Sequence, residues 1–239
     1  KLSHLHFVAT EKSRERVIRM GEDPSKVFNT GCPAIDAIAE INLSLTENFF
    51  DAYGGVGKSI NPTKPYLVVL QHPVTTEFGS GLAQINETLE AVRRTNMQTA
   101  WLWPNVDAGS DDISKGLRMF RERHRELPLH FFRNFGVEDY ARLIANAACL
   151  VGNSSSGIRE GAFLGVPVVN VGTRQHNRER GDNVVDVTYH RDEIHAAIAG
   201  QIEHGPYPSQ PLFGDGFSGK RIADLLATES LSVQKAITY

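Results

Sequence analysis

The feature that most constrains the fold is a regular alternation of apolar, strand-like runs with amphipathic, helix-like stretches between residues 65 and 203. The expected strands are residues 65–70, 99–103, 129–132, 147–151, 166–171 and 183–187. The expected helices are residues 82–95, 112–124, 137–147 and 191–203, with a further helical segment around 158–164. Continuous apolar runs suit strands that are buried on both faces. We therefore expect a three-layer, Rossmann-like α/β fold with a mainly parallel sheet and right-handed crossovers.

Composition argues against several classes of protein. The 239 residues are 41% hydrophobic and 22% charged, which is ordinary for a globular protein. A net charge of -3 leaves no basic excess to offset nucleic-acid phosphates, so we expect no nucleic-acid partner. No apolar run approaches the roughly 20 residues of a membrane span, and we expect no signal peptide. We expect a cytoplasmic protein without a membrane partner, and its two distant cysteines, Cys32 and Cys149, suit a reducing compartment.

The nine histidines are scattered, and no His/Cys cluster has the spacing of metal ligands. We therefore expect neither a metal nor another cofactor.

The N-terminal stretch predicts a strand at 4–10, a helix at 11–20 and a short strand at 27–30. In the helix, Val17, Ile18 and Met20 are expected to face inward, and residues 31–33 to break the chain. Because the sequence starts at Lys1, just before an expected strand, we expect further sequence upstream. The stretch up to about Asp36 would then be the end of one domain and its linker. A helical piece at 46–53 follows.

Two glycine-rich stretches resemble phosphate-binding motifs. Residues 54–59, GGVGKS, lack the first glycine of a P-loop, since residue 52 is alanine, and neither a strand nor a helix flanks them as the motif requires. We expect a flexible surface loop there. Residues 214–219, GDGFSG, match GxGxxG, but prolines rather than a strand precede them. We expect a glycine-rich entry to the last helix, at 220–226.

The stretch at 151–175, VGNSSSGIREGAFLGVPVVNVGTRQ, predicts a strand, a loop of small residues and a helix. The first N–H groups of such a helix are unpaired and can bind an anion such as phosphate. A serine N-cap without a ligand would give the same local pattern. Glu160 near the helix start could bind ribose hydroxyls, and Arg174, after the next strand, could reach an anionic group. Together these residues indicate a nucleotide diphosphate site.

His72 directly follows the apolar strand at 65–70. In an open α/β sheet, ligands bind beyond the carboxyl ends of the strands. His72 is therefore a candidate acid/base or phosphate partner, although a surface histidine in a loop is the alternative. The polar loop at 104–110 is expected at the same edge of the sheet.

Six motifs occur in the following order along the chain: LSHLHFVAT, GCPAID, LQHPVTTE, PNVDAGS, VGNSSSGIREGAFLGVPVVNVGTRQ and FGDG. Together they resemble the UDP-N-acetylglucosamine 2-epimerases, and most closely their hydrolysing branch of the sialic-acid pathway. The resemblance covers nearly the whole chain, but the family's chains begin about one domain before Lys1. It implies a GT-B-like two-domain fold. Residues 1–38 would be the end of its N-terminal Rossmann-like domain and the linker, and residues 39–239 its C-terminal, UDP-binding domain.

The resemblance also implies roles for individual residues. Ser154 and Ser155, with the helix amides around Gly157, would hold the diphosphate. Glu160 would bind the ribose and Arg174 the nucleotide-sugar. The main chain of Phe135 would contact the uracil edge, and Asn105 would line the nucleotide pocket. His72 matches the family's histidine at the reacting sugar.

The implied reaction eliminates UDP from UDP-N-acetylglucosamine and rehydrates the resulting glycal to N-acetylmannosamine. The family's proton-transfer carboxylates would lie in the N-terminal domain, so this chain alone should be inactive. A homo-oligomer is expected. Three alternatives remain open: a hydrolysing epimerase of a UDP-diacetamido-trideoxy sugar, a GT-B glycosyltransferase, and a non-catalytic nucleotide-sugar sensor. The substituents at C4 and C6 of the sugar decide between the two epimerases.

Overall fold

The structure, a computed structural model, describes residues 2–230 and 234–235. The chain forms two compact units, Lys1–Ile41 with Gln210–Tyr239, and Asn42–Ser209. The first boundary lies close to the one expected after residue 38, but the segment from Gln210 groups with the first unit rather than with the second. Whether the two units belong to the two domains of a longer protein stays a prediction.

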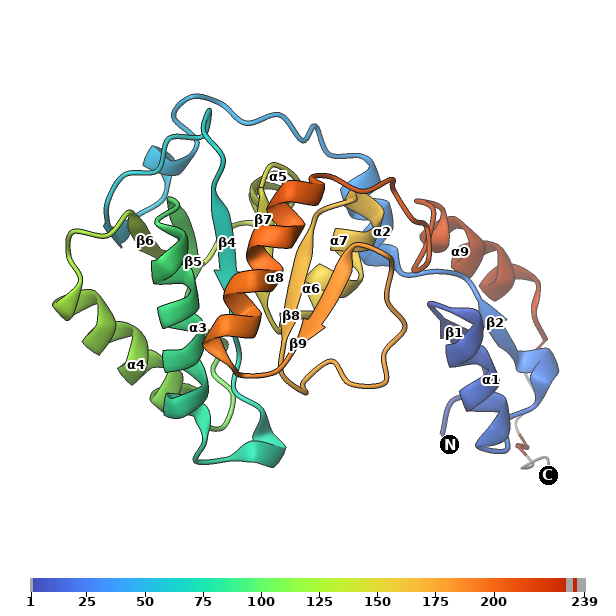
Figure 1. The fold of residues 1–239 in the computed structure, drawn as a ribbon. Coiled ribbons are helices and arrows are strands. Elements are labelled where there is room, and N and C mark those ends of the chain that lie inside the picture. Colours follow the sequence, from blue (N-terminus) through green and yellow to red (C-terminus); the bar gives the residue numbers. More distant parts are fainter. Residues whose placement is uncertain (1, 231–233, 236–239) are drawn as a thin grey trace. The chain divides into compact units, whose positions relative to one another are not determined.

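The second unit is built on a mainly parallel sheet (Figure 1). Its strands in the described part of the chain are β3 (Gly55–Gly57), β4 (Leu67–Leu70), β5 (Thr99–Leu102), β6 (Leu129–Phe132), β7 (Cys149–Gly152), β8 (Val168–Val171) and β9 (Val184–Val187). The order is β3-β6-β5-β4-β7-β8-β9, and only the β3–β6 pair is antiparallel. The chain winds outward from β4 in one direction and from β7 in the other. This creates a topological switch point between β4 and β7, where open α/β sheets bind ligands.

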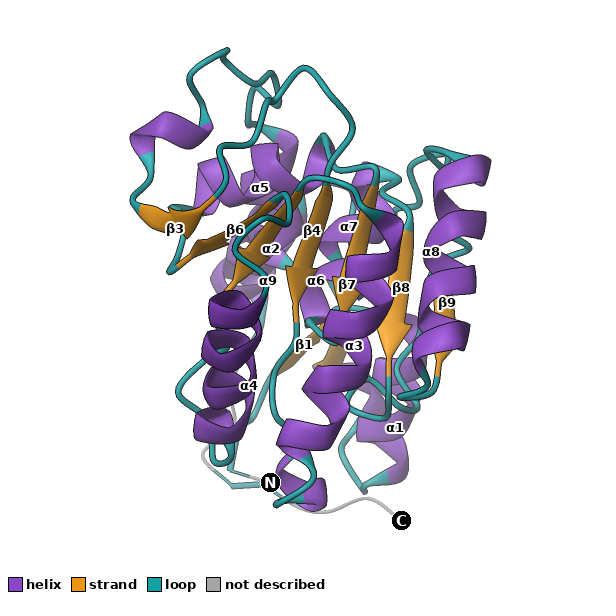
Figure 2. Ribbon diagram, turned by 60° about the vertical axis from the view of Figure 1, so that its left-hand side comes forward, coloured by secondary structure: helices purple, strands orange, loops and turns teal. Residues whose placement is uncertain are grey.

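Helices cover both faces of this sheet (Figure 2). One face carries α3 (Gly81–Thr95), α4 (Ser110–Arg123) and α8 (Arg191–His204). The other carries α5 (Val137–Ala145), α6 (Ser155–Ile158) and α7 (Glu160–Leu164). These helices bury apolar stripes against the strands, as their sequence periodicity predicts.

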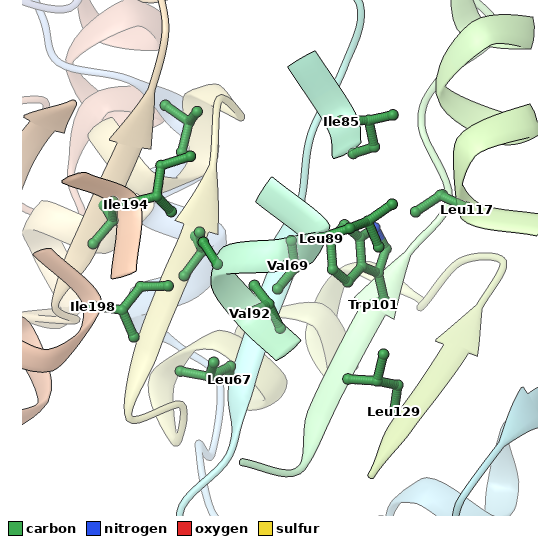
Figure 3. Packing of buried hydrophobic residues seen from close by; sticks show 14 of the residues in the cluster. Leu67, Val69, Ile85, Leu89, Val92, Trp101, Leu117, Leu129, Ile194 and Ile198 are labelled. Atoms are coloured by element: carbon green, nitrogen blue, oxygen red, sulfur yellow. The ribbon is translucent and has the colours of Figure 1, made fainter. Parts of the chain in front are cut away.

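Alternate residues of β4 face opposite layers. Leu67 and Val69 pack against Ile85, Leu89 and Val92 of α3 (Figure 3). Val68 and Leu70 belong to the cluster on the opposite face, with α5 residues and an aromatic group. Because both faces of β4 are fully buried, its exit loop starts from a rigid base.

The prediction of a flexible surface loop at 54–59 is wrong, because these residues contain the strand β3. β3 extends the edge of the sheet by pairing with β6. A side chain at Gly57, whose φ is +142°, would come within 2.1 Å of the Leu129 carbonyl oxygen. The glycines therefore let two backbones approach, and they form no phosphate-binding loop.

Three smaller expectations also need correction. The helical piece expected at 46–53 is a single 3₁₀ turn, Phe50–Ala52, whose Phe50 ring packs edge-on against Tyr66 at 5.4 Å. The break expected at 31–33 instead leads into α2 (Pro33–Ala39), which begins with proline at its first position. Met20 does not face inward but is 62% exposed.

The first unit contains a parallel pair, β1 (His6–Val8) and β2 (Val27–Asn29), connected through α1 (Glu11–Arg19) and a 3₁₀ turn, Pro24–Lys26. It also contains α2 and α9 (Ser218–Thr228), which pack together. The Asp36 carboxylate of α2 accepts hydrogen bonds from the N–H groups of Ser218 (3.0 Å) and Gly219 (2.6 Å), at the start of α9. The glycine-rich stretch is therefore the entry to the last helix, as predicted.

None of the helices in the described residues has the length and apolar character needed to cross a membrane.

Candidate functional site

Four of the residues predicted from the sequence lie around the switch point of the second unit, beyond the carboxyl ends of its strands. His72 follows β4, Asn105 follows β5, Ser154 follows β7 and Arg174 follows β8. A cavity of about 730 Å³ opens at this edge, and Arg174 contributes to its wall. Its lining residues are Pro73, Val74, Thr75, Thr76, Glu77, Asp107, Thr173, Arg174 and His176.

His72 is held in one orientation and one tautomer. It is 4% exposed, and its Nδ1 accepts a hydrogen bond from the main-chain N–H of Asn105 at 3.1 Å. Because a peptide nitrogen can only donate, Nδ1 is the unprotonated nitrogen of the neutral ring and Nε2 carries the hydrogen. Burial and, to a smaller extent, the nearby Arg174 cation lower the pKa of His72 to about 4, against an opposing effect of Asp107. At neutral pH, His72 is therefore an uncharged hydrogen-bond donor through Nε2.

Arg174 supplies the positive charge of the site. Its Nη1 donates to the carbonyl oxygen of Asn153 at 3.1 Å, and its Nη2 lies 3.9 Å from an Asp107 carboxylate oxygen. Burial lowers the pKa of the guanidinium, but an arginine stays charged at neutral pH. A half-buried guanidinium of this kind can bind a phosphate or carboxylate in two-point geometry.

The serine loop, here residues 153–157, follows β7 and includes the first three residues of α6. Ser154 is the N-cap of α6, and its hydroxyl accepts from the N–H of Ser156 at 3.3 Å. The Ser156 hydroxyl lies 2.6 Å from the hydroxyl of Tyr140 on α5. Burial raises the pKa of Tyr140 to about 12, so this phenol remains protonated. The expected single helix is divided at Arg159 into α6 and α7, and the main chain of Arg159 makes one i→i+4 bond on each side, to Ser155 and to Phe163.

Glu160 lies at the start of α7 and is 9% exposed. One carboxylate oxygen is 3.4 Å from Arg159, while Oε2 has no hydrogen-bond partner among the described residues. A buried carboxylate oxygen without a partner is costly, and a ligand hydroxyl would satisfy it.

Gly157 has a packing role as well as its expected place in the phosphate loop. A Cβ there would lie 2.9 Å from the Val168 Cγ1 atom and 3.2 Å from the Leu150 Cδ2 atom. Glycine therefore lets the helix start lie directly on β7 and β8.

Phe135 and Asn105 lie at the exits of β6 and β5. The Phe135 ring is 5% exposed and packs against Tyr53 at 4.3 Å and parallel to Phe49 at 5.9 Å. Neither main-chain group of Phe135 has a hydrogen-bond partner within the described part of the chain. The Asn105 side chain is exposed, whereas its N–H binds His72.

Sequence reasoning missed Asn153 and Asp107 as members of this site. Asn153 is fully buried and contacts both His72 and Arg174. Its signal was an asparagine directly after a buried apolar strand. No group of three or more His, Cys, Asp or Glu side chains suited to a metal occurs in the described residues.

Residues 1–227 match the protein-family model of UDP-N-acetylglucosamine 2-epimerase. The chain belongs to the UDP-N-acetylglucosamine 2-epimerase family. It is 35% identical over 234 residues to the hydrolysing UDP-N,N'-diacetylbacillosamine 2-epimerase of Legionella pneumophila, covering 98% of this chain and 60% of the relative. It is 31% identical to the UDP-N-acetylglucosamine 2-epimerase of Neisseria meningitidis serogroup B, covering 98% of this chain and 61% of that enzyme. The chain thus spans about three fifths of the length of these relatives.

Solved epimerase structures share the fold. The enzyme of Methanocaldococcus jannaschii, in complex with UDP-GlcNAc and UDP, superimposes with a TM-score of 0.73 at 18% identity, over 95% of this chain and 62% of that one. The Neisseria meningitidis enzyme bound to UDP-GlcNAc also gives 0.73, at 19% identity, over 95% of this chain and 62% of that one. The predicted fold class, a Rossmann-like part of a GT-B-like fold, is confirmed.

Proposed function

We propose that this chain is the UDP-binding part of a hydrolysing UDP-N-acetylglucosamine 2-epimerase. The full enzyme would convert UDP-N-acetylglucosamine into UDP and N-acetylmannosamine for the synthesis of sialic acid or a related sugar acid. The observation that carries the proposal is the meeting of His72, Arg174 and the serine loop at the switch point, in a chain of this family. The protein would be a cytoplasmic homo-oligomer without a metal or other cofactor.

The proposed nucleotide site follows from the chemistry of each group. Ser154, Ser155 and the amides near Gly157 would bind the diphosphate. The unpartnered Oε2 of Glu160 would accept a ribose hydroxyl. The free main-chain groups of Phe135 would pair with the uracil edge.

The proposed reaction breaks the C2–H and C1–O bonds of the sugar. A base takes the C2 proton, UDP leaves with the C1–O electron pair, and water then adds across the glycal, with hydrogen at C2 and hydroxyl at C1. Departure of a diphosphate requires hydrogen-bond donors and positive charge at the leaving group. The Nε2–H of His72 and the guanidinium of Arg174 can supply them. Because Nδ1 of His72 is already occupied, His72 suits a donor better than a base. The base would come from an N-terminal domain outside this chain.

A second candidate substrate is a UDP-diacetamido-trideoxy sugar. The 35% identity to the Legionella pneumophila enzyme favours it. Both substrates carry an acetamido group at C2 and a UDP leaving group, so the chemistry proposed for this chain is the same.

The test measures UDP release from each of the two UDP-sugars by the full-length protein that contains this chain. We expect free sugar and UDP without any acceptor, and His72→Ala to lower kcat by about 100-fold or more while UDP still binds. His190→Ala, at a 61% exposed histidine, is the matched control and should retain activity. UDP binding without turnover of either sugar would point to a nucleotide-sugar sensor, and unchanged turnover in His72→Ala would remove His72 from the reaction.

A further inference from the structure

Asn153 extends the pairing of β4 and β7 with its side chain. The last paired residues of these strands are Leu70 and Gly152. One residue later, the Asn153 Oδ1 atom accepts from the N–H of His72 at 2.7 Å, and Nδ2 donates to the carbonyl of His72 at 2.9 Å. The side-chain amide thus replaces the peptide of a neighbouring strand. Only a primary amide offers a donor and an acceptor in this arrangement.

The main chain of Asn153 holds the other side of the site. Its carbonyl oxygen accepts from Nη1 of Arg174 at 3.1 Å and from Nε2 of Gln175 at 2.7 Å. The next residue, Ser154, is the N-cap of α6. His72, Arg174 and the serine loop come from three different strand exits, and all three meet at this one buried residue.

We propose that Asn153 is a positioning residue that fixes the His72 imidazole relative to Arg174 and the serine loop. It acts through His72: by clamping both main-chain groups of His72, it keeps Nδ1 against the N–H of Asn105 and directs Nε2–H to the ligand. The inference rests on the proposed function only for its kinetic consequence, because the geometry itself can be measured without turnover.

The alternative is that Asn153 merely stabilises the fold, as other buried amides do. Gln201 provides the matched control. It is 2% exposed, and its Nε2 donates to the carbonyls of Val168 and Asn183, away from His72 and Arg174. Loss of either amide should destabilise the second unit, but only Asn153 should change the state of His72.

The first measurement records the ¹⁵N shifts of the His72 imidazole in this chain. The wild type and Gln201→Ala should show a single Nε2–H tautomer at pH 7. Asn153→Ala should show a tautomer mixture, because the ring is released from the Asn105 N–H. An unchanged tautomer in folded Asn153→Ala overturns the proposal. If that variant does not fold, Asn153→Asp takes its place, and an unchanged His72 tautomer again overturns the proposal. This variant keeps the acceptor for the His72 N–H and loses the donor to the His72 carbonyl.

The second measurement is a double-mutant cycle on UDP release by the full-length protein. Asn153→Ala should lower kcat by about 10- to 100-fold with little change in KM, since a misplaced catalytic group costs turnover rather than binding. In a His72→Ala background, the same change should cost less than about 3-fold. Equal losses in both backgrounds overturn the proposal. A wild type that releases no UDP would refute the proposed function instead, and the tautomer measurement would still decide the role of Asn153.

Discussion

The chemistry of His72 follows from burial rather than from residue type. An exposed histidine would be partly protonated near neutral pH. Here the ring is almost fully buried beside the Arg174 cation, and both effects favour the neutral form. The sequence could place His72 at the end of a strand, but it could not tell a base from a donor. That distinction depends on the Asn105 N–H, which lies 33 residues further along the chain.

The lowered pKa of His72 predicts how stability depends on pH. Between pH 6.5 and about 4, the unfolded chain protonates this histidine and the folded chain does not, so stability falls as pH falls. When the pH falls from 7.5 to 4.5, the free energy of unfolding should decrease in both proteins. The decrease should be smaller in His72→Gln than in the wild type, by about 2–3 kcal/mol. Urea unfolding followed by tryptophan fluorescence measures this, because Trp101 and Trp103 both lie in the second unit.

His190→Gln is the control, since His190 is 61% exposed and lies outside the proposed site. Parallel pH slopes in the wild type and His72→Gln would show that the His72 pKa is not lowered in the folded protein.

At the scale of elements, the sequence predicted those pieces whose local pattern agrees with their packing. β4 to β9, α3, α4, α5 and α8 appear close to their expected bounds, because continuous apolar runs and amphipathic periods are local signals. β3 could not be predicted, since three residues of Gly-Val-Gly have little strand preference and pair only because the edge of β6 is available. Because ligands bind beyond the carboxyl ends of parallel strands, the sequence could predict that four residues lie at the same edge of the sheet: His72, Asn105, Ser154 and Arg174. The role of Asn153 could not be predicted in this way, since it depends on the hydrogen bonds of its side chain.

α9 depends on a residue of another helix for its start. The Asp36 carboxylate accepts the first N–H groups of α9, at Ser218 and Gly219. Asp36→Ala should destabilise α9 by about 1–2 kcal/mol, seen as roughly 5- to 30-fold faster hydrogen exchange of its amides. Exchange is the suitable measurement because neither tryptophan lies in the first unit.

Asp224→Ala is the matched control for this prediction. Its carboxylate is 64% exposed and pairs with Lys220 on the surface of α9. Surface ion pairs of this kind contribute little to stability, so hydrogen exchange of the α9 amides should change by less than about 2-fold. Equal acceleration in both variants would mean that Asp36 does not cap the helix.

At the scale of the whole molecule, the sheet order confines the proposed nucleotide site to the second unit. The chain winds outward from β4 and from β7, and every residue proposed to contact UDP lies in the exit loops of that sheet's strands or in the short helices α6 and α7 that follow β7. The chain should therefore bind UDP without an N-terminal domain, although turnover would require one. Sequence patterns could not assign Gln210–Tyr239 to the first unit, because that assignment depends on packing between α2 and α9.

UDP binding to this chain should protect amides of the second unit only. Hydrogen exchange should slow at the serine loop, at α7 and near His72 and Phe135, while β1, α1 and β2 should exchange as before. UDP at 100 times its Kd should stabilise the second unit by about 2.7 kcal/mol.

Glu160→Gln should weaken UDP binding by about 10-fold or more, because it removes the charged acceptor with the free oxygen. Glu138→Gln, at a 71% exposed carboxylate on α5, should bind UDP normally. Protection spread over both units, or equal affinity in the two variants, would contradict a UDP site built by the second unit alone.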